Sequence, residues 1–265
     1  MGSSVETSLW AWIGLHLVLC SGSLPEITDK EFINECLREH NKARSSVMPS
    51  ANNMLHMTWD EGLAITARAW ARRCIFDHNI YLKDARRVHP TFSSVGENIW
   101  TISSQSFTPT RAIESWVNEK NHYNYQRNTC TKVCGHYTQV VWASSYKVGC
   151  AAHLCPDGIQ HFISSEGLLF VCNYATAGNM NNEKPYESPG APCSGCEGTC
   201  VDSLCRSDER DLERSYSWAP DWDWASATSG STYVSILVSR PVALALTFIA
   251  AYATRYFYPD VFCYE

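Results

Sequence analysis

The sequence has no cluster of basic residues, since no run of lysine or arginine in its 265 residues is longer than two. The formal net charge is −6 at pH 7. Proteins that bind nucleic acid or an anionic membrane surface concentrate positive charge on one face. We therefore expect no nucleic-acid partner.

Two common hydrolase signatures, GxSxG and HExxH, are also missing. There is no internal repeat and no Asn-x-Ser/Thr glycosylation sequon outside the targeting segments; Asn128-Thr129-Cys130 is at most the rare cysteine variant. The composition, with 45% hydrophobic and 18% charged residues, is that of a globular protein. No enzyme class follows from a local motif.

Cysteine, in contrast, is abundant. Thirteen cysteines are too many for an ordinary cytosolic protein, where reducing conditions leave disulfides little use. The apolar run Leu9–Cys20 is too short to span a bilayer, and Ser-Gly-Ser follows it. We expect a signal peptide over residues 1–23 and an extracellular protein.

A second apolar run lies near the C-terminus, over residues 232–254. It is about long enough to cross a bilayer, so we expect a single-pass membrane helix there and a short tail over 255–265. Arg240 and Pro241 interrupt the run. Two alternatives stay open: a glycolipid-anchor signal with its small residues near Ser229, and a secreted protein without an anchor.

Helix caps and hydrophobic periodicity organise the first two thirds of the chain. Thr28 with Glu31 and Thr58 with Glu61 form capping-box patterns, and Thr108 precedes a third helical stretch. We expect helices over 32–44, 62–74 and 113–123, and strands over 96–100, 137–142, 148–154 and 168–174. This order favours an α+β layered domain with an antiparallel sheet.

The expected strand over 137–142 follows His136 directly. Alternation along a strand places Thr138 and Trp142 on the same side as His136, and Tyr137 and Gln139 on the other. After Tyr174 the composition turns rich in Gly, Asn and Pro, which indicates a domain boundary. Four cysteines then fall within thirteen residues, so we expect a disulfide-held hinge over 185–206 and a stalk over 207–231.

Four sequence blocks together resemble one family: GENIW at Gly96, WVNEKNHY at Trp116, CGHYTQVVWASS at Cys134 and FVCNYATAGN at Phe170. They resemble the signature blocks of the CAP superfamily of cysteine-rich secretory, antigen 5 and pathogenesis-related proteins, and within it the glioma pathogenesis-related proteins. The resemblance implies a three-layer α-β-α sandwich, the CAP domain, over residues 28–180.

The resemblance also implies a disulfide pattern. By position, it pairs Cys74 with Cys155, Cys130 with Cys134, Cys150 with Cys172, Cys193 with Cys200, and Cys196 with Cys205. Cys36 is left over on the apolar face of the first helix. A buried thiol and an intermolecular bridge both remain open for it.

Residue by residue, the family's central cleft maps onto two histidines and two glutamates, His78, Glu97, Glu119 and His136. We call these four residues the tetrad. The resemblance makes His78 and His136 candidate ligands of a divalent metal, with zinc as the cofactor that imidazole favours. Glu97 and Glu119 are candidates to orient the rings or to act as catalytic bases. The alternative is a hydrogen-bonded polar network without metal.

No organic cofactor is expected, and the other histidines after the signal peptide are assigned to the surface or to local packing: His40, His56, His89, His122, His153 and His161. The main hypothesis is an extracellular binding or signalling module, membrane-anchored or shed, for a protein receptor or a lipid or sterol ligand. A metal-dependent hydrolase and a soluble secreted CAP protein are the alternatives, and we expect no enzyme. Relatives that block ion channels add a six-cysteine module, which this chain lacks.

Overall fold

The computed structural model describes residues 24–103 and 107–257. The expected signal peptide over 1–23 and the end of the tail from residue 258 lie outside the described residues. Two compact units divide the chain, Met1–Pro220 and Asp221–Glu265. Each unit is described by itself below.

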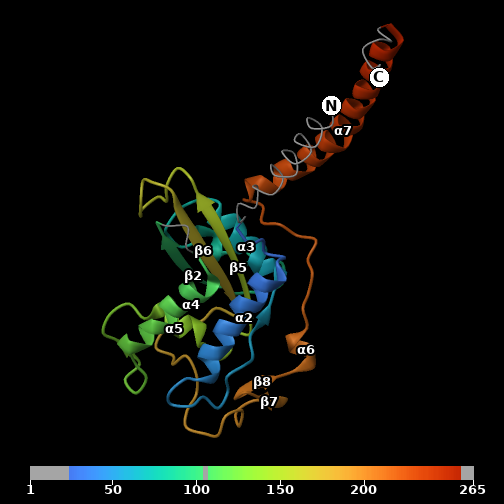
Figure 1. The fold of residues 1–265 in the computed structure, drawn as a ribbon. Coiled ribbons are helices and arrows are strands. Elements are labelled where there is room, and N and C mark those ends of the chain that lie inside the picture. Colours follow the sequence, from blue (N-terminus) through green and yellow to red (C-terminus); the bar gives the residue numbers. More distant parts are fainter. Residues whose placement is uncertain (1–23, 104–106, 258–265) are drawn as a thin grey trace, which may run out of the picture. The chain divides into compact units, whose positions relative to one another are not determined.

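The first unit combines helices with short and long strands (Figure 1). The elements that build the domain are α2 (Lys30–Ser45), β1 (Thr58–Trp59), α3 (Glu61–Ala71), two 3₁₀ turns η1 (Ile80–Lys83) and η2 (Ala85–Arg87), β2 (Gly96–Ile102), α4 (Pro109–Asn118), a 3₁₀ turn η3 (Glu119–His122), β3 (Tyr123–Asn124), β4 (Thr129–Cys130), α5 (Gly135–Val140), β5 (Lys147–Cys155) and β6 (Gly167–Ala175). The segment after the domain forms β7 (Thr199–Val201), β8 (Leu204–Arg206) and α6 (Asp208–Asp211).

A four-stranded sheet in the order β1-β5-β6-β2 forms the centre of the domain. β6 pairs antiparallel with both β5 and β2, while the two-residue β1 pairs parallel with β5. The three long strands confirm the strands expected over 96–100, 148–154 and 168–174. The sheet is therefore antiparallel, as expected, except for the short β1 at one edge.

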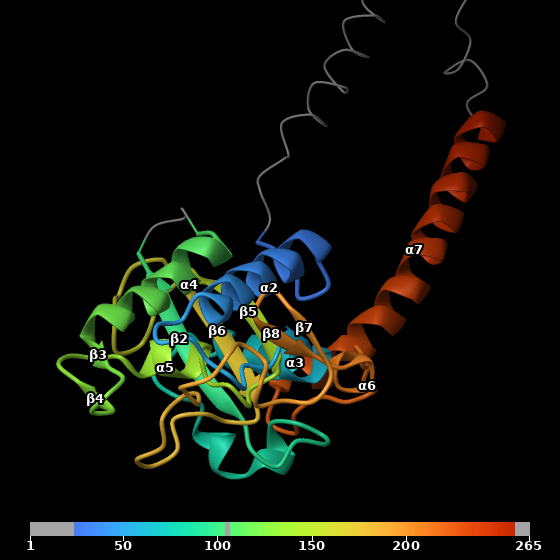
Figure 2. The ribbon, with the colours of Figure 1, turned by 90° about the horizontal axis from the view of Figure 1, so that it is seen from below.

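Helices cover both faces of this sheet (Figure 2). On one face, the ring of Phe170 in β6 lies 6.3 Å from that of Phe32 in α2 and 5.5 Å from that of Trp116 in α4. On the opposite face, Gly149 of β5 meets α3 so closely that a Cβ would overlap the backbone at Leu63 and Ala64. Successive residues of a strand point to opposite faces, so the layers are helix, sheet, helix.

The N-caps of two helices lie one and two residues after the threonines that the sequence analysis predicts. The N-cap of α2 is Asp29, whose carboxylate accepts the N–H of Glu31, rather than Thr28. The N-cap of α3 is Asp60, which accepts the N–H of Leu63 at 3.0 Å, while Thr58 lies in β1. A carboxylate interacts favourably with the positive helix N-terminus and fits the cap as well as a hydroxyl does. The cap at Thr108 is confirmed.

The strand expected over 137–142 is wrong, because residues Gly135–Val140 form the short helix α5. The faces assigned from strand alternation to the residues around His136 are therefore wrong as well. A six-residue helix has little intrinsic stability and depends on tertiary contacts. Those contacts come from Glu119 and Arg44, which are distant in sequence and bind opposite ends of α5, as detailed below.

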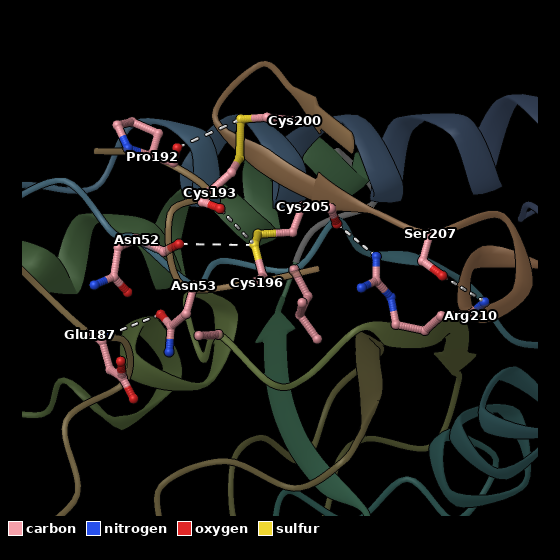
Figure 3. The surroundings of a disulfide bond; sticks show 12 residues. Asn52, Asn53, Glu187, Pro192, Cys193, Cys196, Cys200, Cys205, Ser207 and Arg210 are labelled. Carbon is pink, nitrogen blue, oxygen red and sulfur yellow. Dashed lines mark hydrogen bonds between the residues drawn. A yellow bond between two sulfur atoms is a disulfide. The ribbon is translucent and has the colours of Figure 1, made fainter. Parts of the chain in front are cut away.

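The cysteine-rich segment after the domain lies against it. Cys205 of β8 pairs with Leu55 in a parallel bridge, and Asn52 and Asn53 contact Cys196 and Glu187 of the hinge (Figure 3). Further on, the Tyr216 hydroxyl donates to the Asp60 carboxylate at 2.9 Å. The first part of the segment expected as a stalk is thus in contact with the domain.

Five disulfides stabilise the first unit, and they are the five pairs that the family resemblance implies: Cys74–Cys155, Cys130–Cys134, Cys150–Cys172, Cys193–Cys200 and Cys196–Cys205. Cys150 and Cys172 are direct partners across β5 and β6. Cys36 is a free, fully buried cysteine whose thiol pKa burial raises. Its surroundings fit the buried-thiol alternative.

The second unit consists chiefly of the helix α7 (Trp224–Phe257). Throughout residues 24–103 and 107–257, no helix has both the length and the apolar character that are needed to cross a bilayer. The membrane-spanning helix expected over 232–254 is therefore not supported. α7 includes these residues, but Arg240 and Pro241 divide its apolar stretch.

Candidate functional site

His78 and Glu97 form one half of the tetrad. Glu97 is the second residue of β2, and its side chain is 0% exposed, whereas that of His78 is 62% exposed. Nδ1 of His78 lies 3.0 Å from Oε1 of Glu97, which also accepts the backbone N–H of Asn79 at 2.8 Å. Asn173, paired with Glu97 across β6, donates its side-chain N–H to Oε2 at 3.3 Å. Three donors therefore fix this carboxylate, which in turn orients the His78 ring.

The carboxylate also changes the acidity of this ring. The hydrogen bond to Glu97 raises the pKa of His78, against the opposing effect of partial burial. Nδ1 carries a proton in this hydrogen bond, so loss of the second proton leaves a lone pair on Nε2. In the neutral ring of His78 the free lone pair is therefore on Nε2.

Glu119 and His136 form the other half. Nδ1 of His136 lies 2.7 Å from Oε1 of Glu119, and Oε2 accepts the backbone N–H groups of His136 at 3.1 Å and of Tyr137 at 3.3 Å. These N–H groups belong to the first turn of α5, whose own N-cap, Cys134, makes no side-chain cap hydrogen bond. Glu119 therefore supplies both the helix cap and the partner of the imidazole.

Arg44 of α2 binds the opposite end of the same helix. Its side chain is fully buried and donates to the carbonyls of Val140 at 3.0 Å, Trp142 at 2.6 Å and Ala143 at 3.0 Å. It also donates to Leu55 O at 2.6 Å. Burial lowers the pKa of Arg44 to about 9. Because this pKa is still above 7, the side chain stays charged at neutral pH. A cation at the C-terminus and a carboxylate at the N-terminus both complement the dipole of α5.

Adjacent residues of β2 connect the two halves. Glu97 binds His78, while Asn98, the next residue, donates its side-chain N–H to the backbone carbonyl of His136 at 3.0 Å. The start of β2 thus holds both candidate ligands. Over the described residues, however, no three tetrad members have ligand atoms within 4.8 Å of one another.

The tetrad fits a metal through its imidazoles rather than its carboxylates. Each histidine uses Nδ1 for a carboxylate, and Nε2 of neither ring forms a hydrogen bond within residues 24–103 and 107–257. This is the arrangement in which an outer carboxylate fixes the tautomer of a zinc-binding histidine. His78 and His136 therefore fit zinc as ligands, with Glu97 and Glu119 behind them.

A second group of possible metal ligands, Cys193, Cys196 and Cys205, lies in the hinge. All three sulfurs are in disulfides, Cys193 with Cys200 and Cys196 with Cys205 (Figure 3). A disulfide sulfur is not the thiolate that zinc binds, so the hinge cysteines do not form a zinc site.

The residues next to His136 have structural roles. Tyr137 and Gln139 are buried, and the Gln139 amide donates to the Ser145 hydroxyl at 3.1 Å. The Thr138 hydroxyl donates to the Asn179 side chain at 2.6 Å. Trp142 is 5% exposed, as expected for a core residue.

Sequence reasoning missed the contribution of His40 and Asn98 to the tetrad's surroundings. The sequence places His40 at the surface or in local packing, whereas it is completely buried in α2, and nothing in the sequence singles out Asn98 inside GENIW. Asn98 lies within GENIW, one of the four blocks that carry the family resemblance, whereas His40 lies in none of them. Neither spacing nor periodicity indicates their partners.

A three-layer helix-sheet-helix domain closed by disulfides and followed by a small disulfide-bonded hairpin defines a class of extracellular, cysteine-rich proteins. The sequence matches the family model described as CAP, cysteine-rich secretory protein family, over residues 37–174. The chain belongs to this family, which confirms the resemblance seen in the sequence.

Curated relatives agree with this assignment. GLIPR1-like protein 1 of Bos taurus is 48% identical over 222 residues, which cover 81% of this chain and 87% of the relative. Glioma pathogenesis-related protein 1 of Mus musculus is 41% identical over 266 residues, covering 98% and 94%. Peptidase inhibitor 16 of Homo sapiens is 38% identical over 217 residues, covering 78% and 44%. None of these names describes an enzyme, which agrees with the expectation for this chain.

Solved structures confirm the fold. The structure titled NaASP2 with Zn²⁺ is 27% identical, has a TM-score of 0.54, and matches 69% of this chain and 100% of its own. The structure of Na-ASP-1 is also 27% identical, with a TM-score of 0.55, and matches 71% of this chain and 50% of its own. The first of these is a structure of that protein with Zn²⁺.

Proposed function

We propose that this chain is an extracellular binding protein that holds a divalent metal ion, zinc, through Nε2 of His78 and His136. One observation carries the proposal: both rings are bound at Nδ1 by a carboxylate, which leaves both Nε2 atoms for a metal. The zinc named with the solved relative NaASP2 supports this choice of metal. Bound zinc would supply positive charge and open coordination positions for water or for a ligand of the partner.

The geometry favours binding over hydrolysis. A general base must reach the proton that it removes. The Glu97 side chain is 0% exposed and already accepts three hydrogen bonds, and both oxygens of Glu119 accept hydrogen bonds from α5. Neither carboxylate has the exposure of a free base, so we assign both to orienting the histidines.

Exposed apolar side chains next to the histidines support a protein, lipid or sterol partner. Ile80, two residues after His78, is 66% exposed, and Val133, three residues before His136, is 67% exposed. Met180 is 50% exposed and follows Asn179, whose side-chain N–H donates to Gly135 O at the start of α5. Each of these exposed apolar side chains is close in sequence to a tetrad histidine or to a residue that contacts α5, which supports an interaction surface there.

Flotation with phosphatidylcholine vesicles, with and without cholesterol, separates the partner classes. Binding that is lost when Ile80, Val133 and Met180 are all replaced by serine would support a lipid or sterol ligand at this surface. Binding that survives the replacement would contradict it. Failure of the wild-type protein to bind either vesicle would favour a protein partner.

We propose that the domain lies outside the cell, which five disulfides and the secretory family support. Antibody detection of the expressed full-length protein in the medium or on intact cells is the expected result. Detection only after permeabilisation would contradict this location.

Titration of the purified full-length protein with zinc tests the metal site. The wild type is expected to bind one zinc ion per chain at this site, and the double variant His78→Ala, His136→Ala to lose that binding. His161→Asn is the matched control, because His161 is an exposed histidine with a positive φ of 68°, which asparagine tolerates. Unchanged zinc binding by the double variant would overturn the proposal.

A further inference from the structure

We infer that Asn98 is a positioning residue for His136, and that a buried His40–Tyr174 pair holds the Asn98 amide in place. The inference rests on the metal site proposed above, because it assigns to this network the placement of one metal ligand. It concerns groups on the side of the sheet that α2 covers.

Asn98 contacts two groups with the same amide nitrogen. Asn98 lies in β2 and is 1% exposed. Nδ2 donates to the carbonyl of His136 at 3.0 Å and to the hydroxyl oxygen of Tyr174 at 3.2 Å. An amide nitrogen has two N–H groups, so both are used and the amide cannot turn over without losing them.

The directions of the remaining hydrogen bonds follow from the chemistry of the groups. Nδ1 of His40 lies 2.7 Å from the carbonyl of Cys36, which can only accept, so Nδ1 carries the proton. Burial lowers the pKa of His40 to about 4, so the ring is neutral at pH 7 and Nε2 is an acceptor. The Tyr174 hydroxyl, 2.9 Å away, donates to Nε2. Its oxygen is then left to accept from Asn98.

This chain of hydrogen bonds has one consistent direction and joins four elements. It runs from α5 at His136, through Asn98 of β2 and Tyr174 of β6, to His40 of α2. His40 and Tyr174 are both 0% exposed, so no solvent competes for these bonds. The network therefore fixes the backbone of His136 relative to the sheet and α2.

His136 is consequently held on both sides of its peptide units. Glu119 binds its N–H and its ring Nδ1, and Asn98 binds its carbonyl. Fixing the backbone as well as the ring limits where Nε2 can lie, which matters for a metal that requires defined ligand positions. A network that only satisfied buried polar groups would stabilise the fold without affecting that atom.

Two variants and one control separate these roles. Asn98→Leu removes both donated hydrogen bonds in a similar volume, and Tyr174→Phe removes only the hydroxyl that fixes the amide. Thr66→Val is the control, because Thr66 lies in α3, away from the network. Its fully buried hydroxyl donates to the carbonyl of Val88 at 2.6 Å. Each variant is compared as full-length protein for zinc affinity, for thermal unfolding, and for the imidazole Nδ1–H resonance of His136 in proton NMR.

Asn98→Leu is expected to weaken zinc binding by about 10-fold or more, the usual effect of losing an outer partner of a metal ligand. It is also expected to shift the His136 Nδ1–H resonance or broaden it through exchange. Tyr174→Phe should move both readouts in the same direction by less. Thr66→Val should lower the unfolding temperature and leave both readouts unchanged.

The inference is overturned if Asn98→Leu keeps wild-type zinc affinity and an unchanged His136 resonance, or if Thr66→Val reduces both as strongly. If the wild type binds no zinc, the proposed metal function fails. The His136 resonance then still decides whether Asn98 positions the ring.

Discussion

Both carboxylate oxygens of Glu119 are bound by one residue, His136: its ring Nδ1 lies 2.7 Å from Oε1, and its backbone N–H lies 3.1 Å from Oε2. The same side chain therefore starts a helix and selects the tautomer of the histidine that the helix carries. Helix formation and ligand orientation are coupled at this position, so a change in Glu119 affects stability and metal binding together.

Glu119→Gln tests this coupling. The neutral amide loses the charge that favours the N-terminus of α5, and one of its two ends becomes a donor that faces N–H groups. We expect the free energy of unfolding in urea to fall by about 1–2 kcal/mol, as for a lost N-cap. We also expect the variant to bind zinc more weakly than the wild type. The control is Glu114→Gln, since Glu114 is 54% exposed on the preceding helix and should change neither.

Glu97→Gln is expected to lower the pKa of His78. The hydrogen bond from His78 to the Glu97 carboxylate raises that pKa in the wild type, and a neutral amide stabilises the imidazolium ring less. NMR titration of the His78 ring protons measures the shift directly and needs no metal. An unchanged or higher pKa in the variant would show that the carboxylate does not control this ring.

Acid should destabilise the fold through His40. Burial lowers its pKa from 6.5 to about 4, so between these values the unfolded chain binds a proton that the folded protein does not. Stability from this group is complete above pH 6.5 and is lost as the pH falls toward 4, amounting to about 3 kcal/mol. Between pH 7 and pH 4, the free energy of unfolding in urea should fall by about 3 kcal/mol less in His40→Gln than in the wild type.

His56 does not affect the difference in pH dependence between the wild type and His40→Gln. Burial also lowers the pKa of His56 to about 4, but this residue is present in both proteins and contributes the same acid sensitivity to each. If the free energy of unfolding of the wild type and of His40→Gln depended equally on pH, His40 would be protonated in the folded state between pH 6.5 and pH 4.

Arg44→Met should be among the most damaging single changes. It leaves the carbonyls of Val140, Trp142 and Ala143 without their buried donor. We expect a loss of about 3 kcal/mol or more in the free energy of unfolding, because each unsatisfied buried carbonyl is costly. In Arg38→Met, a surface position that is 59% exposed, the loss should stay below about 1 kcal/mol. Similar losses in both variants would contradict the assigned role of Arg44.

The long strands were predictable because their signals are local. β5 and β6 are apolar runs bounded by turn residues, and GENIW reads as a strand without knowledge of its neighbours. The helix caps were predicted to within two residues. Asp29 and Asp60 replaced the expected threonines because either side chain can cap, and local sequence does not rank them.

α5 was not predictable in the same way. The alternation in YTQVVW matches a strand, and contacts from residues of other elements, among them Glu119 and Arg44, stabilise it as a helix. The membership of the tetrad came from family likeness, since the spacing between His78 and His136 is too long to indicate a site. Its pairing into His78–Glu97 and Glu119–His136 required the structure.

X-ray absorption at the zinc edge of the zinc-loaded full-length protein tests the central claim most directly. The account predicts two imidazole ligands at about 2.0–2.1 Å, with the remaining ligands from light atoms and none from sulfur. It also predicts that His78→Ala and His136→Ala each remove one imidazole contribution. A sulfur ligand at about 2.3 Å, or an imidazole count that neither variant changes, would contradict it.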